Sequence, residues 1–405
     1  KMKPTLLQKQ CLALVDRQLH SIQHGTLHLT LPDQQTKKYG QANTHNPQHL
    51  HVTDYTFFTQ IVFSGNIGLG ESYTDNHWNT PNLPGLLSLF IHNIHALKKS
   101  GINSGWAKRL LHLLSHATNR NTKSGSRKNI QAHYDLGNDF YQTFLDPETM
   151  LYSAALFQHP DQSLPDAQKA KIHQLIRLAD IQPHHHILEV GCGWGGFAIE
   201  AARSTGCRVT ALTISQAQYD LAQQRIDQAN LSDQITLHLC DYRDATGTYD
   251  RIVSIEMLEA VGHAYYGTYF HTLDRLLKPG GRIALQVITI PDQRYDAYRR
   301  NPDWIQKHIF PGGILPSLTE LSTAMTQHST LHIDHLENIG IHYAETLRRW
   351  RTACESQSEK LEQLGYDETF QRKWIYYLAY CEAGFQTRFN NDLHLVLKRP
   401  AEDPC

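Results

Sequence analysis

Several features that define large protein classes are missing from this sequence. It has no apolar run long enough to span a membrane and no charged-then-apolar leader, so we expect an unsecreted protein without a membrane span. Its seven cysteines are an odd number and include no Cys-x-x-Cys pair, which favours reduced thiols in the cytoplasm over disulfides or a zinc site. None of the 26 histidines belongs to a His-Glu-x-x-His motif, and we predict no metal centre.

Acidic residues are missing from one long stretch. The 405 residues carry a formal net charge of −1, yet positions 76–134 contain no aspartate or glutamate. Eight basic residues lie there among tryptophan and leucine, a composition typical of a surface that binds anionic lipid. The alternative is a solvated helix face joined to a linker at 119–126, and we find no nucleic-acid-binding module. We define this basic belt as Lys98, Lys99, Lys108, Arg109, Arg120, Lys123, Arg127 and Lys128.

The length and the globular composition suit two domains. In the first part of the chain, the alternation at 25–32 predicts a half-buried strand, and 57–63 predicts a buried helix or strand. Positions 83–97 predict an amphipathic helix with Pro84 in its first turn. We therefore expect a smaller N-terminal α+β domain.

A glycine-rich turn organises the second part. An apolar strand at 186–190 is followed by Gly191-x-Gly193-x-x-Gly196 and an alanine-rich helix, the pattern of a nucleotide-binding βα turn. An NAD site requires an acidic residue at the end of the second strand, but the strand at 208–213 ends in threonine. Glu189 instead stands two residues before the first glycine, the arrangement of S-adenosylmethionine (SAM) methyltransferases. The pattern therefore favours SAM over NAD.

Strands and helices alternate through the rest of the chain. Helices are predicted at 164–181 and 216–229, the second capped by Ser215, and strands at 235–239, 249–255 and 282–288. This order predicts a doubly wound parallel sheet whose ligand lies beyond the carboxyl ends of the strands. An aromatic, glycine-bearing excursion at 291–320 takes the position of a lid, and 331–341 with 393–397 predict a closing strand pair. The residues at the predicted strand ends are Glu189, Gly191, Thr213, Asp241, Tyr242, Glu256, Glu259, Gln286 and Ile288.

Six ordered motifs resemble one family over nearly the whole chain. They are Gly68-Leu-Gly-Glu-Ser-Tyr, His133-Tyr-Asp-Leu-Gly-Asn, Leu188-Glu-Val-Gly-Cys-Gly-Trp-Gly-Gly, Leu212-Thr-Ile-Ser-Gln-Ala-Gln, Ile255-Glu-Met-Leu-Glu-Ala-Val-Gly-His and Ile309-Phe-Pro-Gly-Gly. With them the chain resembles the cyclopropane-fatty-acyl-phospholipid synthases and the related mycolic acid methyltransferases. The resemblance implies an N-terminal lipid-binding domain with the basic linker over 1–125. It also implies a Rossmann-like SAM-dependent catalytic domain over 126–405.

The resemblance also implies site residues. A bicarbonate ion would act as general base in a pocket of Ala154, Glu259, Gln286, Ile288 and Tyr343. Ala154 and Gln286 depart from the best-known bacterial pattern, which has cysteine and histidine there, and this departure concerns the product more than the activity. Cys381 matches a cysteine sometimes assigned as catalytic, although helix packing is the alternative. SAM would contact Tyr152, Ser153, Glu189, Gly191, Cys192, Gly193, Gly195, Thr213, Gln218, Asp241 and Tyr242.

The implied chemistry explains these residue types. An alkene is a poor nucleophile, so the site must align it with the sulfonium methyl and exclude water. The cation that follows needs aromatic faces, and a base then removes a proton. Glu259 would anchor the bicarbonate or accept the proton itself, whereas Glu256 would cap a helix or contact the cofactor. The aromatic candidates are Tyr134, Tyr152, Tyr265, Tyr266, Phe310 and Tyr343.

The leading hypothesis is cyclopropane formation on the cis double bond of an unsaturated phospholipid, at the inner face of the membrane. Methylation to a methylene or methyl-branched chain is the nearest alternative. Small-molecule O- or N-methylation would leave the lipid module unexplained, and a lipid-binding protein that retains SAM without catalysis is the non-enzymatic alternative. We expect no nucleic-acid partner, and a homodimer stays open.

Overall fold

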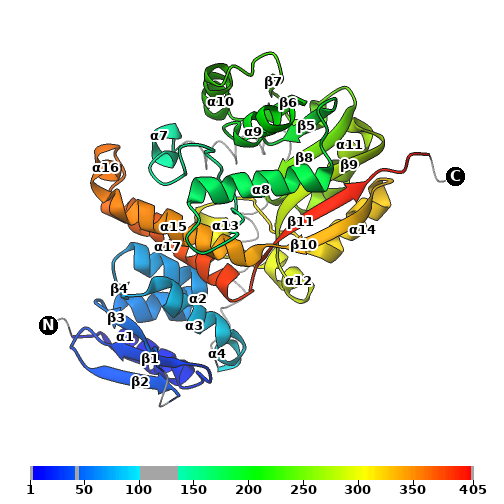
Figure 1. The fold of residues 1–405 in the computed structure, drawn as a ribbon. Coiled ribbons are helices and arrows are strands. Elements are labelled where there is room, and N and C mark those ends of the chain that lie inside the picture. The colour runs from blue at the N-terminus through cyan, green and yellow to red at the C-terminus, as the bar shows by residue number, and fades with distance from the viewer. Residues whose placement is uncertain (1–2, 42–44, 101–135, 403–405) are drawn as a thin grey trace. The chain divides into compact units, whose positions relative to one another are not determined.

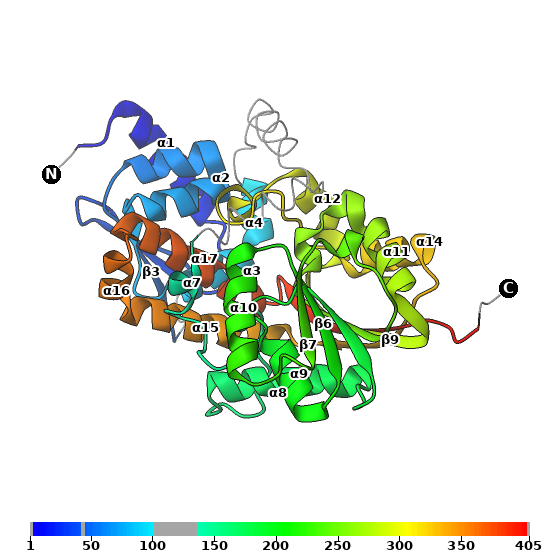
Figure 2. The ribbon, with the colours of Figure 1, turned by 90° about the horizontal axis from the view of Figure 1, so that it is seen from above.

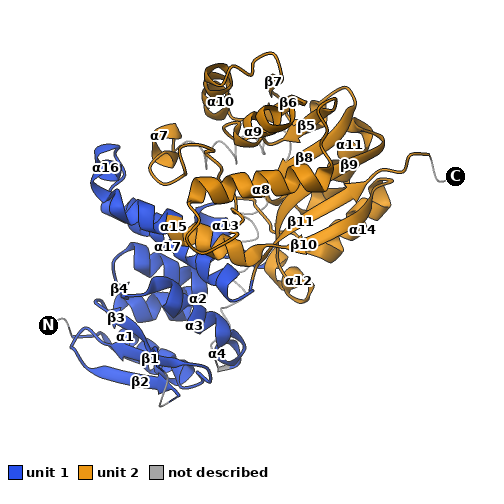
Figure 3. Cartoon of the chain, viewed as in Figure 1, with its two compact units in different colours: residues 1–115, 301–309, 350–389 blue, residues 116–300, 310–349, 390–405 orange. Residues whose placement is uncertain are grey.

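The computed structural model describes residues 3–41, 45–100 and 136–402, and the chain divides into two compact units (Figure 3). Unit 1 comprises residues 1–115, 301–309 and 350–389, and unit 2 comprises the rest. The predicted domain boundary at 125 and the basic belt from Lys108 onward lie outside the described residues. Two segments that we expected in the catalytic domain, 301–309 and 350–389, pack within unit 1.

Unit 1 contains a small mixed sheet with the strand order β2-β1-β3-β4. Leu27 and Leu29 of the predicted first strand are fully buried, because alternate side chains of a strand face the same side. Trp78 is also fully buried, and its indole N–H donates to the Ser72 hydroxyl at 3.0 Å. The strands are β1 (Thr26–Thr30), β2 (Thr36–Gly40), β3 (Gln48–Val52) and β4 (Trp78–Asn79).

The helices of unit 1 refine two predictions. The segment 57–63 belongs to a helix, α2, which is kinked at Gly65 with a φ of 56°. The predicted helix at 83–97 is interrupted at Asn93, whose side-chain oxygen accepts the Gln23 N–H at 2.8 Å and the His24 N–H at 3.0 Å. The helices are α1 (Leu6–Leu19), α2 (Thr56–Thr74), α3 (Leu83–His92), α4 (Ile94–Ser100), α13 (Trp304–His308), α16 (Ser358–Gln363) and α17 (Glu368–Gln386).

Specific contacts place the two later segments in unit 1. The Arg372 guanidinium of α17 lies 4.1 Å from the centre of the Tyr73 ring and donates to the Tyr73 carbonyl. In α13, Lys307 and His308 both contact the Glu71 carboxylate, at 2.5 and 2.9 Å. Part of the predicted lid at 291–320 is therefore fixed to α2 by the contacts of Lys307 and His308 with Glu71, and to α17 by the packing of Trp304 on Tyr376.

Unit 2 is built on a seven-stranded sheet with the order β10-β11-β9-β8-β5-β6-β7 (Figure 1). Neighbouring strands from β9 to β7 are parallel, and β11 runs antiparallel between β9 and β10. The predicted α/β class is confirmed, and the predicted closing pair is β10 and β11. The strands are β5 (His186–Val190), β6 (Arg208–Thr213), β7 (Ile235–Leu239), β8 (Tyr249–Ile255), β9 (Leu277–Thr289), β10 (His332–Asn338) and β11 (Asn391–Lys398).

Helices cover both faces of this sheet. Ile187 shares one hydrophobic core with α8, α9 and α10, whereas its neighbour Leu188 shares the opposite core with α11 and α14. Figure 2 shows the strands between α8 and α9 on one side and α11 and α14 on the other. The helices are α7 (Asn138–Tyr141), α8 (Leu164–Ala179), α9 (Gly196–Thr205), α10 (Gln216–Gln228), α11 (Tyr266–Leu276), α12 (Asp292–Arg300) and α14 (Leu318–His328).

Helix α15 (Gly340–Ser356) begins in unit 2, and its residues from Trp350 onward belong to unit 1. Three short 3-10 helices, η1 (Tyr242–Asp244), η2 (Leu258–Ala260) and η3 (His263–Tyr265), follow strand ends in unit 2. Within the described residues, no helix combines the length and the apolar character that crossing a membrane requires.

Candidate active site

The glycine turn after β5 is shaped by backbone conformation. Gly191, Gly193 and Gly195 have φ angles of 79°, 53° and 87°, which side chains disfavour. The N–H groups of Gly191 and Cys192 donate to the Leu212 carbonyl at 3.1 and 2.8 Å, so the turn is held against β6. A Cβ added at Gly193 would meet no atom within 4 Å. The turn therefore leaves open space beside its backbone, as a bound ligand requires.

A buried carboxylate lies at the same turn. Glu189 is 2% exposed, and its Oε2 has no hydrogen-bond partner among the described residues. Burial raises the pKa of Glu189 to about 8. A buried carboxyl with one oxygen left without a donor fits a cationic ligand, and SAM carries both an ammonium and a sulfonium group. The predicted glycine cradle and Glu189 therefore fit SAM.

Four other predicted cofactor residues, Thr213, Gln218, Asp241 and Tyr242, lie at or after the ends of β6 and β7 in unit 2. The Thr213 hydroxyl donates to the Gln218 side chain at 2.9 Å, and Ser215 caps α10 as predicted. Asp241 forms a bidentate pair with Arg243, with its shorter contact at 2.7 Å. The remaining predicted residues lie as follows: Tyr242 packs on Tyr269, Tyr152 packs on Tyr141, Ser153 accepts from Lys171, and Cys192 is buried, which raises the pKa of its thiol.

A second group of polar residues is centred on Glu256, the first residue after β8. Its Oε1 accepts the backbone N–H of Ala154 at 3.0 Å and the side-chain amide of Gln286 at 2.8 Å. Its Oε2 accepts the Tyr343 hydroxyl at 2.9 Å. Three residues predicted to hold bicarbonate therefore all donate to one carboxylate of the chain itself. Glu256 caps no helix, because the following 3-10 helix η2 has no side-chain cap.

The other two residues predicted for the bicarbonate pocket bind each other. The Ile288 N–H donates to Glu259 Oε1 at 2.5 Å, and Glu259 Oε2 has no partner among the described residues. Burial, and secondarily the charge of Glu256, raise the pKa of Glu259 to about 8. At neutral pH Glu259 is therefore mainly a protonated acid.

Three buried polar residues that the sequence analysis missed complete this group. Lys171 of α8 is fully buried, and its ammonium donates to the Ser153 hydroxyl and the Ala154 carbonyl, both at 2.8 Å. His394 of β11 donates to Gln286 Oε1 at 2.9 Å, and burial lowers its pKa to about 3, so it is neutral. Burial and the neighbouring Glu256 raise the pKa of Asp392 far above its ordinary value.

The sequence did contain signals for these residues. Lys171 lies on the apolar face of the predicted helix 164–181, together with Ile172 and Leu175. Asp392 and His394 lie two residues apart, on one face of a strand that is otherwise apolar. A polar or charged residue at a position that the periodicity assigns to the core therefore indicates a buried functional residue.

Cys381 differs from the other candidates. It lies in α17 and belongs to unit 1, whereas the remaining predicted site residues belong to unit 2. Burial raises the pKa of its thiol well above the ordinary value, which opposes formation of a thiolate. Its catalytic role stays a prediction, and the aromatic candidate Tyr134 lies outside the described residues.

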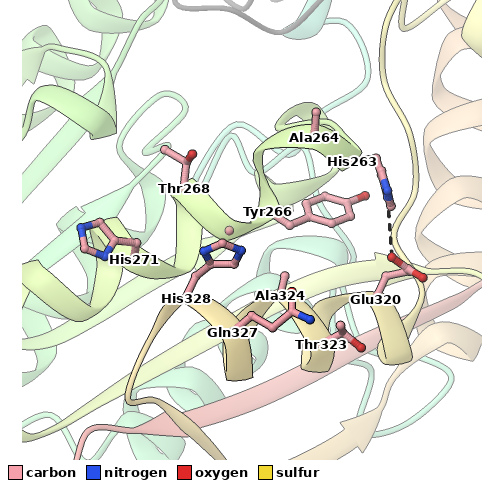
Figure 4. A pocket seen from close by; sticks show the side chains of 11 residues that line it. His263, Ala264, Tyr266, Thr268, His271, Glu320, Thr323, Ala324, Gln327 and His328 are labelled. Atoms are coloured by element: carbon pink, nitrogen blue, oxygen red, sulfur yellow. Dashed lines mark ion pairs between the residues drawn. The ribbon is translucent and has the colours of Figure 1, made fainter.

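A separate pocket of about 460 Å³ lies between α11 and α14 (Figure 4). His263, His271 and His328 line it, and Glu320 lies 3.7 Å from His263. Only Tyr266, one of the aromatic candidates, is shared with the predicted site. In the described ranges, no group of three or more histidine, cysteine, aspartate or glutamate residues has the arrangement of a metal site.

Comparison with known proteins agrees with this geometry. Residues 121–395 match the family described as mycolic acid cyclopropane synthetase. The chain is 40% identical over 332 residues to the tuberculostearic acid methyltransferase UfaA1 of Mycobacterium tuberculosis, covering 80% of this chain and 77% of that protein. It is 34% identical over 362 residues to the cyclopropane-fatty-acyl-phospholipid synthase of Escherichia coli K12, covering 88% and 89%.

Solved structures point the same way. The mycolic acid cyclopropane synthase CmaA1 complexed with SAH and CTAB matches with a TM-score of 0.63 and 30% identity, over 67% of this chain and 98% of that one. The cyclopropane synthase MmaA2 from Mycobacterium tuberculosis matches with a TM-score of 0.62 and 28% identity, with the same coverage. On its motifs, its fold and these matches, the chain belongs to the mycolic acid cyclopropane synthetase family.

Proposed function

We propose that this SAM-dependent methyltransferase acts on the cis double bond of an unsaturated phospholipid acyl chain and closes a cyclopropane ring there. One observation carries the proposal: a Cβ added at Gly191 would lie 2.8 Å from Met257 Cγ, so the cofactor turn touches the segment between Glu256 and Glu259. A methyl donor held at the glycine turn is thereby next to the polar group that can remove a proton.

The residues of the chain divide this reaction among them. When bound, SAM supplies an electrophilic methyl group. Glu189 places a buried carboxyl at the turn, and a bound cation would favour its ionised form. Tyr343 presents its ring and hydroxyl beside Glu256. The site must also exclude water, because water would react with the carbocation that forms on the substrate. The base is an oxygen anion in both versions of the mechanism. It is either the bicarbonate predicted from the resemblance or a carboxylate side chain of the protein.

A methylene or methyl-branched product is the second candidate. It is supported by the 40% identity to a protein named tuberculostearic acid methyltransferase. The cyclopropane and the methylene product begin with the same methyl transfer, and they differ in which carbon then loses the proton. A saturated methyl branch would in addition require reduction of the methylene product by a separate reductant. The acid–base group around Glu256 therefore decides between them.

The membrane is the proposed partner, with peripheral contact at its cytoplasmic face, and a homodimer stays an untested alternative. Of the basic belt, Lys98 and Lys99 lie in the last turn of α4. If the belt binds anionic lipid, high salt will weaken binding to anionic vesicles. Binding that salt leaves unchanged would contradict this role.

The direct test is mass spectrometry of unsaturated phospholipid vesicles incubated with the protein and SAM, with a control lacking SAM. A gain of one CH₂ group with loss of the double bond identifies the cyclopropane. The same gain with unsaturation retained identifies the methylene product. No gain, with SAM still bound, would contradict a lipid alkene substrate.

A further inference from the structure

We infer that Glu256 is a catalytic residue, which accepts the proton released from the methylated substrate and fills the anion position predicted for bicarbonate. The inference rests on the proposed function and deepens it. It begins from the hydrogen bonds at Glu256, where Ala154, Gln286 and Tyr343 all direct donors at the carboxylate within 3.0 Å. Two anions cannot occupy one set of donors, so a bicarbonate ion would have to displace this side chain.

The backbone at Glu256 supports a functional reason for this residue. Its φ of 50° lies in the left-handed region, which is costly for a residue with a side chain. The Glu256 N–H donates to the Gln286 carbonyl at 2.7 Å, which holds the strained residue against β9. Glycine would adopt this conformation without strain, so the glutamate is retained at a cost in stability.

The two nearby carboxyl groups have different environments. Glu256 accepts three hydrogen bonds, from a backbone N–H, a side-chain amide and a phenol hydroxyl. Glu259 accepts one backbone N–H and is otherwise desolvated, so it holds its proton. Paired carboxyls with different partners take different roles, and Glu256 is the one held by the donors that were predicted to bind the base.

The surrounding residues position Glu256. Gln286 is fixed in one orientation, because its oxygen accepts from His394 while its amide donates to Glu256 and to the Ala154 carbonyl. Lys171 also donates to the Ala154 carbonyl, which holds the 151–155 loop whose Ala154 N–H faces Glu256. We therefore treat Gln286, His394 and Lys171 as positioning residues.

The carbon–sulfur pair of the donor stays on sulfur, and the π pair of the alkene forms the new carbon–carbon bond, which leaves a cation on the other alkene carbon. One C–H bond of the new methyl group then breaks, and its electron pair closes the ring. The proton passes to the Glu256 carboxylate and is later released to water, so each turnover releases one proton.

The experiment compares full-length wild type with Glu256→Gln and Glu256→Gly on unsaturated phospholipid vesicles, in CO₂-depleted buffer with and without added bicarbonate. The wild-type rate should not depend on bicarbonate. Glu256→Gln should lose about 10²–10⁴-fold in rate, without rescue, because the amide fills the position and is no base. Glu256→Gly should lose a similar factor and regain activity with bicarbonate, because the three donors are left open.

A second measurement does not depend on turnover. Carbon-13 NMR of labelled bicarbonate should show binding to Glu256→Gly and none to wild type or Glu256→Gln. The thermal unfolding of each variant checks that it is folded. If the glycine variant fails to fold, the bicarbonate dependence of wild type and the rate of Glu256→Gln still show whether Glu256 is the base. A wild-type rate that requires bicarbonate, or a Glu256→Gln rate equal to wild type, would overturn the inference.

The two proposals fail in different ways. Wild type that forms no lipid product contradicts the proposed function, and the NMR comparison still reports which anion occupies the position. Wild type that forms the product only with bicarbonate supports the function and rejects Glu256 as the base.

Discussion

The cofactor side and the acid–base side of the site are built by different means. On the cofactor side, three glycines within 191–195 place backbone groups around open space, and Glu189 is adjacent in the same segment. On the acid–base side, Glu256 is held by donors from the 151–155 loop, β9 and α15. One side depends on local backbone conformation, whereas the other depends on side chains from distant segments.

This difference predicts different responses to substitution. A change at the glycines of the cofactor turn alters ligand affinity with a modest effect on folding. A change on the acid–base side leaves buried polar groups without partners, so it alters stability and rate together. The following variants test this distinction, in order of expected effect.

Lys171→Met should have the largest effect on stability. The substitution removes the donor to Ser153 and Ala154. It also removes the positive charge that interacts with the buried carboxyl of Asp392. We expect a loss of about 2–4 kcal/mol in the free energy of unfolding, together with loss of activity. Denaturant unfolding measures the first quantity.

Lys169→Met on the same helix is the matched control. Lys169 pairs with Glu148 at 2.5 Å at a partly exposed position, and an ion pair of this kind contributes about 0–1 kcal/mol. Equal losses for the two variants would contradict a special role for the buried lysine.

Glu189 should make stability depend on pH. Its folded pKa of about 8 lies above the ordinary value of 4.5, so the folded state binds more protons between these values. The free energy of unfolding should therefore fall as pH rises from about 4.5 to 8, by on the order of 5 kcal/mol, and then level off. Glu189→Gln should remove this part of the slope, and the difference between the two profiles isolates it. Parallel profiles would show that Glu189 ionises normally.

Gly193→Ala should weaken SAM binding about tenfold or more, because the added Cβ enters the open space beside the turn. Gly206→Ala is the control. Gly206 also has a positive φ and open space, but it lies at the far end of α9. Both variants should lose about 1 kcal/mol of stability, and only Gly193→Ala should lose affinity in a calorimetric titration. Unchanged affinity in both would place the cofactor elsewhere.

Tyr343→Phe should have the smallest effect, a loss of about tenfold in kcat with unchanged SAM affinity. It removes one of the three donors to Glu256 and keeps the ring. Tyr249→Phe is the control, because its hydroxyl donates to the Thr246 carbonyl at 3.0 Å near the start of β8. A loss of SAM affinity in Tyr343→Phe would mean that the two sides of the site are coupled.

The same contrast explains what the sequence predicts. The strand, the glycines and Glu189 are contiguous, so one local pattern predicts the cofactor turn, and the alternation of strands and helices predicts the sheet. Asp392 and His394 become neighbours of Gln286 only through the register between β11 and β9. The two strands are far apart in the sequence, at 277–289 and 391–398. The periodicity of each strand predicts which residues share a face, but it does not predict which strand lies beside it or in which register.

Two helical predictions failed for local reasons. The helix expected at 83–97 stops at Asn93, because its side chain bonds to the backbone of residues 23 and 24. Of the two roles left open for Glu256, the helix cap is wrong, because the residue adopts a left-handed conformation and its carboxylate accepts from three donors. In both cases the side chain forms hydrogen bonds with residues that are distant in the sequence.

The position of β11 has a consequence for biosynthesis. This strand carries Asp392 and His394 and lies between β9 and β10, although both of its neighbours precede it in the chain. During translation the glycine turn can therefore form while β9 still presents an unpaired edge, which favours aggregation. The nascent chain is exposed to this risk until the segment 391–398 emerges, and only then can the residues that position Gln286 reach it.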